Sequence, residues 1–79
     1  MTYWVNFENP TPLCRMGWGV TAIDEADARV IVMGSPEWAR EPCAIASIRA
    51  ISFDEIEKNH VRPNMGNILA RGIWFPDGI

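Results

Sequence analysis

Basic residues are few in this sequence, and they are not clustered. The 79 residues carry seven Lys and Arg against ten Asp and Glu, giving a net charge of −3. Because a phosphate backbone is bound by clustered cations, we expect no nucleic-acid partner. No apolar run approaches the roughly 20 residues that span a bilayer, and the first residues show no basic segment followed by an apolar stretch. We therefore expect no membrane association and a cytoplasmic location.

Thiols and imidazoles, which ligate metals and act as nucleophiles, are also scarce. Cys14, Cys43 and His60 are the only ones, and they lie far apart in the sequence. Without CxxC or HxxxH spacing we expect no metal site, and we expect no cofactor. In a reducing compartment the cysteines should be reduced thiols packed as small apolar groups. The glycine pair around Trp18 lacks the third glycine and the Lys-Ser/Thr of a phosphate-binding loop.

Carboxylates form two clusters, around Asp24 to Asp27 and Asp54 to Glu57. Both clusters fall in the first turns of expected helices, where acidic side chains cap the chain and offset the helix dipole. The sequence therefore predicts no catalytic carboxylate pair, and we expect a protein that is not an enzyme.

The sequence does have an ordinary apolar content of 48%, which predicts one globular domain spanning residues 1–79. Alternation and turn residues predict strands at Tyr3–Glu8, Trp18–Ile23, Cys43–Ile51 and Ile68–Phe75. Capping residues predict a main helix from Asp24 to Met33 and a short helix from Ser52 to about His60. The segments 9–12, 36–42 and 62–67 are expected to be loops or turns.

Two of these elements carry detailed expectations. The recurrence of Ala26, Val30 and Met33 at helical spacing supports the main helix. Residues 43–51 are ambiguous because isoleucines three apart favour a helix, whereas their β-branched composition favours a strand, which we predict. The predicted fold is an α+β two-layer sandwich in the order β-β-α-β-α-β. Its four-stranded sheet is mostly antiparallel, with the strand order left open.

Tryptophan is the residue in excess, with four in 79. If Tyr3, Val5 and Phe7 point inward, Trp4 points outward. The same alternation turns Trp74 outward if Ile73 and Phe75 face the core. Trp38 lies in the proline-bounded loop. The alternative is that a second layer, such as this loop or the short helix, covers Trp4 and Trp74.

Two segments carry a resemblance. Gly17 to Ala22 reads GWGVTA, and the C-terminal third contains Asn59 to Gly66 and the RGIWFP run from Arg71 to Pro76. Together they resemble a family of small, uncharacterised bacterial proteins. The resemblance implies bacterial origin and a compact fold, and it brings no known activity.

Outward Trp residues beside Arg are typical of protein interfaces. We therefore expect a non-enzymatic protein-binding module, in the form of a bacterial immunity or antitoxin-like inhibitor that covers a toxin active site. The acidic balance favours a basic toxin domain as the protein partner. The expected apolar anchors are Trp4, Trp38 and Trp74, and the expected polar rim is Arg71, Glu37 and Glu41.

Two alternatives stay open. A small enzyme or ligand-binding domain could use His60 with Cys14 or Cys43, with Asn64 completing a polar site. A homodimer could instead form through an exposed sheet face.

Overall fold

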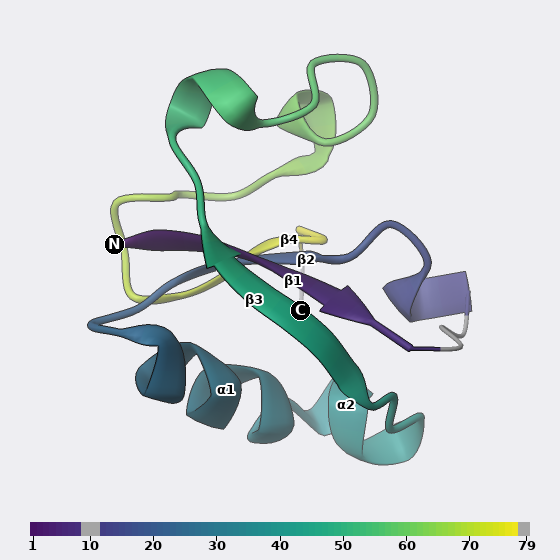
Figure 1. Cartoon of the computed structure of the whole chain (residues 1–79). Helices are drawn as coiled ribbons and strands as arrows, with labels where there is room; N and C mark the ends of the chain where they lie inside the picture. Colours follow the sequence, from purple (N-terminus) through teal and green to yellow (C-terminus); the bar gives the residue numbers. More distant parts are fainter. Residues whose placement is uncertain (9–11, 78–79) are drawn as a thin grey trace.

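The computed structural model describes residues 1–8 and 12–77. Its strands are β1 (Thr2–Phe7), β2 (Trp18–Thr21), β3 (Ile45–Ala50) and β4 (Gly72–Phe75), and its helices are α1 (Glu25–Met33) and α2 (Pro36–Arg40). The strands form one antiparallel sheet in the order β3-β1-β2-β4 (Figure 1). The predicted α+β class, with a four-stranded antiparallel sheet, one main helix and one short helix, is confirmed.

The short helix lies earlier in the chain than the sequence analysis predicts. Ser35 caps α2, Pro36 occupies its first turn and Arg40 its last turn, so the expected loop at 36–42 satisfies the rules for a helix. The expected helix from Ser52 to His60 is a single 3₁₀ turn at Phe53–Glu55, and a second 3₁₀ turn follows at Arg62–Asn64. The predicted turn at 9–12 falls mostly outside the described residues.

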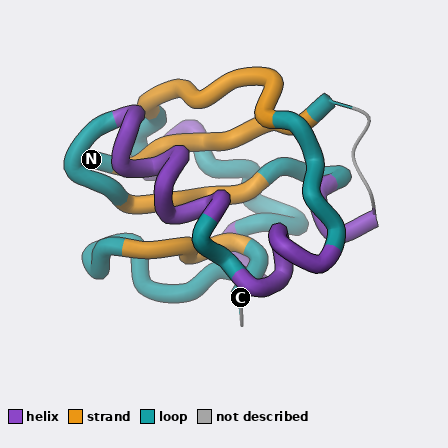
Figure 2. Tube along the Cα trace, turned by 90° about the horizontal axis from the view of Figure 1, so that it is seen from below, coloured by secondary structure: helices purple, strands orange, loops and turns teal. Residues whose placement is uncertain are grey.

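The two faces of the sheet are covered differently. Helices α1 and α2 lie on one face, and the irregular segment between β3 and β4 crosses the other face (Figures 1 and 2). The first core cluster lies under the helices and includes Val5, Trp18 and Val20. The second cluster lies under the irregular segment and includes Ile56, Val61 and Trp74. Each face of the sheet therefore has its own apolar core.

Helix α1 does not turn the recurring residues Ala26, Val30 and Met33 toward the core. Its buried residues are Ala28 and Val32, whereas Val30 is 65% and Met33 is 48% exposed. The rotation is fixed by Asp27, which accepts hydrogen bonds from the Ile23 N–H and from the Arg71 side chain. Both sides of the helix are apolar, so the spacing of apolar residues could not distinguish them.

A bulge between β1 and β3 explains why simple alternation of inward and outward residues fails in β3. Between β1 and β3 the register moves from Asn6↔Ser47 to Phe7↔Ile45, so the strand gains one unpaired residue. That extra residue turns Ile45 and Ile48, three positions apart, toward the same core. The helix-like spacing of residues 43–51 is therefore produced by a bulged strand.

Candidate functional site

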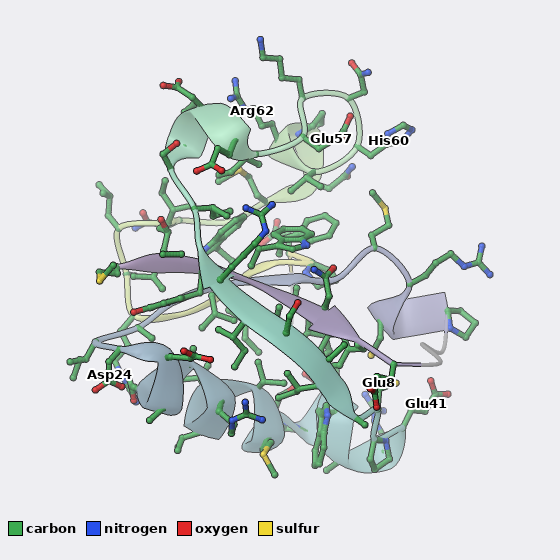
Figure 3. All side chains as sticks on the ribbon, in the orientation of Figure 1. Glu8, Asp24, Glu41, Glu57, His60 and Arg62 are labelled. Carbon is green, nitrogen blue, oxygen red and sulfur yellow. The ribbon has the colours of Figure 1, made fainter. Side chains whose placement is uncertain are left out.

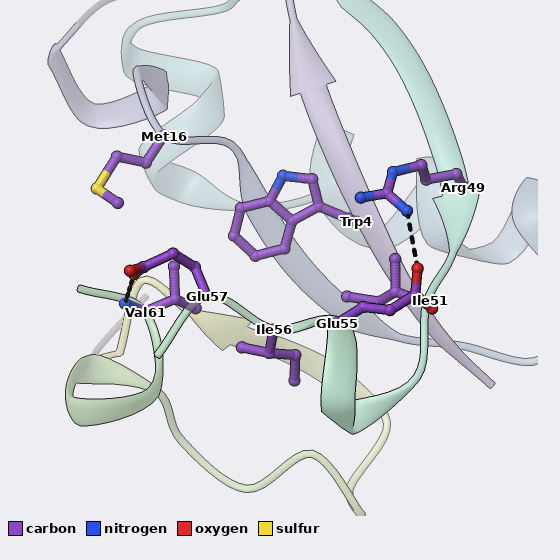
Figure 4. A pocket seen from close by; sticks show the side chains of 8 residues that line it. All are labelled: Trp4, Met16, Arg49, Ile51, Glu55, Ile56, Glu57 and Val61. Atoms are coloured by element: carbon purple, nitrogen blue, oxygen red, sulfur yellow. Dashed lines mark hydrogen bonds and ion pairs between the residues drawn. The ribbon is translucent and has the colours of Figure 1, made fainter. Parts of the chain in front are cut away.

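The site lies on the sheet face opposite the helices, around Trp4 of β1. The indole of Trp4 is half-buried and packs beside Phe75, with ring centroids 5.7 Å apart, and beside Trp74 at 6.0 Å. The polypeptide from Ile51 to Met65 crosses this face and leaves one edge of the Trp4 ring uncovered (Figure 4). An aromatic surface thus remains at the bottom of a depression.

That depression is a pocket of about 270 Å³. Apolar side chains form most of its wall, and charged side chains stand at its edge (Figure 4). We call it the Trp4 pocket; its lining residues are Trp4, Met16, Arg49, Ile51, Glu55, Ile56, Glu57 and Val61.

The pairing of β1 with β3 brings Trp4 and Arg49 side by side in the Trp4 pocket. Trp4 and Arg49 are direct cross-strand partners in β1 and β3, so both project from the same face. On the other side, the chain entering β2 passes close to the indole at Gly17, whose φ is +89°. A Cβ at Gly17 would lie only 2.6 Å from Trp4 Nε1, so only glycine fits here without displacing the ring.

The covering segment is held by side chains that bond to its backbone. The Arg62 guanidinium stacks 4.4 Å from the Phe53 ring centroid and donates to the Phe53 carbonyl, which links the two 3₁₀ turns. Glu57 accepts hydrogen bonds from the N–H groups of Asn59 and His60. These contacts give the irregular layer a defined shape without an α-helix.

Both carboxylates of the Trp4 pocket are engaged and ionised. The backbone N–H of Ser52 is the main cause that lowers the pKa of Glu55, which also pairs with Arg49 at 3.4 Å. The N–H of His60 is the main cause that lowers the pKa of Glu57. A carboxylate held in its charged form is a poor general acid at neutral pH. Both side chains therefore present negative charge at the Trp4 pocket.

The predicted tryptophan anchors do not form one surface. Trp74 is 1% exposed, so the expectation that it points into solvent is wrong. A bulge makes the register step from Gly19↔Phe75 to Val20↔Ile73, and both Trp74 and Phe75 turn into the second core cluster. This also corrects the prediction that Phe75 shares the face of Ile73. The alternative of a second layer describes Trp74 correctly.

Trp38 lies in the other layer. It packs against the core under the helices, and its indole N–H donates to the Cys43 carbonyl at 3.0 Å. Its α2 neighbours are placed with it: Glu37 pairs with Arg40 at 3.6 Å, and Glu41 is exposed at the end of the helix (Figure 3). The predicted rim residues Glu37 and Glu41 therefore lie across the sheet from Trp4.

His60 and Asn64 do come together, but within one turn. The Asn64 side-chain amide donates to the His60 carbonyl at 2.7 Å, and the His60 ring lies 3.5 Å from the Glu57 carboxylate. Both residues are exposed in the irregular layer (Figure 3). Cys14 and Cys43 are buried thiols in the core under the helices. The structure therefore does not pair His60 with a thiol.

Arg71, the remaining rim residue, binds the start of α1. Its Nε donates to Asp27 Oδ2 at 3.0 Å and its Nη2 donates to Oδ1, a two-point pairing of fork and carboxylate. This hydrogen bonding is the main cause that lowers the pKa of Asp27 to about 2. Arg71 thus fastens the loop before β4 to the helix, on the far side of the sheet from the Trp4 pocket.

A pH dependence of stability follows from Asp27. Since its pKa is lower in the folded chain than its ordinary 3.8, its contribution is complete above about pH 4 and is lost as the pH falls toward 2. We expect the free energy of unfolding, measured by urea titration at pH 7, 4 and 2.5, to fall less steeply with acid in Asp27→Asn. Arg71→Gln should flatten the same portion, because it removes the main cause of the lowered pKa of Asp27. A wild-type acid slope in both variants would contradict this assignment.

In residues 1–8 and 12–77, no three His, Cys, Asp or Glu side chains gather closely enough to hold a metal ion. No helix in that part of the chain has the length and apolar character to cross a membrane.

Comparison with known proteins gives no match to this chain among family models, curated proteins or solved structures. The resemblance to small bacterial proteins therefore stays a prediction. Sequence reasoning found Trp4, and it missed Met16, Ile56 and Val61. Strand alternation identifies residues that share a sheet face, but no local pattern identifies a distant segment that covers it.

Proposed function

We propose that the chain is a non-enzymatic protein-binding module in which the Trp4 pocket receives an apolar side chain of a protein partner. The observation that carries this is the half-buried Trp4 indole at the base of an open apolar pocket of about 270 Å³. Aromatic side chains in such depressions dominate binding energy at protein interfaces.

The edge of the pocket suggests the partner's polarity. Arg49 is paired with Glu55, so Glu57 adds acidic character at the mouth. The whole chain carries a net charge of −3. Both features favour a partner with a basic surface around the inserted side chain. We propose a bacterial immunity or antitoxin-like protein that works in the cytoplasm and covers the active site of a basic toxin domain.

Trp4→Ala tests this proposal. We expect immobilised wild-type protein to retain a specific protein from lysate of the native host, identified by mass spectrometry. The isolated partner should then bind Trp4→Ala at least about 30-fold more weakly, as truncation of a hot-spot aromatic residue does. Titration calorimetry with the purified partner measures the loss.

Two further variants separate binding from folding. Met16→Asp places a charge at the half-exposed mouth of the pocket and should weaken binding without removing the Trp4 packing. Leu69→Ala alters an apolar side chain that is 89% exposed and lies outside the pocket, so it should bind normally. Equal affinity of Trp4→Ala, Met16→Asp and wild type would dispose of the pocket as a binding site.

The alternative of an enzyme built on His60 lacks a supporting geometry. The buried thiols lie under the helices and His60 is exposed in the irregular layer. A nucleophile and its base must be within hydrogen-bond reach. We therefore prefer the binding proposal.

A further inference from the structure

Helix α1 is apolar on the side that faces the core and also on the side that faces away. Ala28 and Val32 are buried against the sheet. Ala26, Val30 and Met33, spaced by four and three residues, form an exposed stripe along the outside, with Val30 65% and Met33 48% exposed. We call these three residues the outer stripe. An apolar stripe on a helix is normally packed against another element, and among the described residues only the other side of α1 is covered (Figure 1).

We propose that the outer stripe packs against the same stripe of a second copy of this chain, with the two α1 helices antiparallel about a twofold axis. Such an interface is isologous, so each side must be complementary to itself. The apolar outer stripe meets that requirement, with Ala26 and Val30 nearest the axis and Met33 toward the end of the contact.

The charged residues beside the outer stripe are also complementary to the same residues of a second copy. Glu25 and Arg29 lie one turn apart along the same edge of the stripe, both exposed. Within residues 1–8 and 12–77, neither forms an ion pair in its own chain. When two helices pack antiparallel, the same edges face each other, so Glu25 lies opposite Arg29 of the second copy and Arg29 opposite its Glu25. The twofold axis that produces these two ion pairs passes between the levels of Ala26 and Val30.

The opposite edge of the stripe is already neutral. Asp27 lies there and is paired with Arg71 of the same chain. No unpaired like charges would therefore face each other across the axis at that edge. An acidic residue followed by a basic residue along one edge is complementary to an antiparallel copy of itself. We therefore infer that a second copy of this chain covers the outer stripe.

The size of the stripe sets the expected strength. A nine-residue helix is about 13 Å long, so the contact is smaller than the roughly 800 Å² per partner of a standard interface. The dimer should therefore be weak and depend on concentration. It also leaves the Trp4 pocket open, because the pocket lies on the other face of the sheet, so this inference and the proposed function stand or fall separately.

Sedimentation equilibrium of the purified chain from about 10 µM to about 1 mM, the range of weak association, tests the proposal. We expect a reversible monomer–dimer equilibrium for wild type. Val30→Asp, which puts a carboxylate of each copy into the apolar contact, should weaken the dimer at least about tenfold. A wild type that is monomeric throughout this range, or a Val30→Asp variant that dimerises as wild type does, overturns the proposal.

Charge reversal tests the antiparallel arrangement. Arg29→Glu should also weaken the dimer, because it puts four carboxylates along the facing edges. Glu25→Arg combined with Arg29→Glu restores two opposite-charge pairs and should bring dimerisation back to about twofold of wild type. Circular dichroism checks that each variant is folded. If the double variant dimerises no better than Arg29→Glu, the antiparallel arrangement is wrong.

Discussion

Trp18→Ala should destabilise the chain by about 3–5 kcal/mol, a large part of the roughly 5–15 kcal/mol that holds a small domain folded. Trp18 in β2 is 0% exposed, and its ring meets the edge of Phe7 with centroids 5.5 Å apart. Truncation leaves a cavity between the sheet and the helices, and the short helices α1 and α2 cannot move far enough to close it. Thermal unfolding followed by circular dichroism should show a midpoint lowered by more than about 10 °C.

Trp18→Phe is the matched control, since it keeps an aromatic ring against Phe7 and removes less volume. Its midpoint should fall between those of wild type and Trp18→Ala. A change of less than about 2 °C in Trp18→Ala, well below 1 kcal/mol at this chain length, would mean that Trp18 is not the centre of the core under the helices.

Gly19→Ala is the second variant with a large expected effect, although it adds a single methyl group. The Trp74 ring lies flat over Gly19, and a Cβ there would be 2.4 Å from its ring carbons. The indole is 1% exposed, so it has no space to move away. Overpacking of this kind costs about 1–3 kcal/mol or more. Urea unfolding of Gly19→Ala against wild type measures the cost.

A double-mutant cycle attributes that cost to the indole. In a Trp74→Leu background the ring is absent, so Gly19→Ala should cost at least about 1 kcal/mol less than it does in wild type. Gly34→Ala at the end of α1, where φ is −85° and a Cβ would be 3.1 Å from the Val30 carbonyl oxygen, serves as a milder control. If the cost of Gly19→Ala is the same with and without the indole, the contact does not explain it.

Capping and alternation predicted much of this fold because both depend on neighbouring residues. Asp24 caps α1 through the Asp27 N–H at 2.8 Å, and Glu55 bonds to the Ser52 N–H as expected of a capping box. Tyr3, Val5 and Phe7 all face the core under the helices. Such signals are contained within a few residues, so one sequence suffices to find them.

What the sequence could not predict depends on distant partners. The rotation of α1 is fixed by Arg71, which lies far along the chain from Asp27. The side on which Phe75 lies depends on a bulge in its pairing with β2. The Trp4 pocket likewise exists only because residues after β3 return over β1. Its aromatic base could be predicted from alternation, whereas its walls could not.

The central position of β1 has a consequence for how the chain reaches this state. The first strand lies between β2 and β3, and Tyr3 pairs with Ala50. The sheet therefore cannot close until a long loop has been brought together, and the entropy of that closure is lost before the pairing compensates it. Chains dominated by such non-local contacts typically fold in milliseconds to seconds, far more slowly than helical bundles of equal length. Until β3 pairs with it, one edge of β1 exposes unpaired backbone N–H and C=O groups. Refolding at high protein concentration therefore favours strand pairing between molecules.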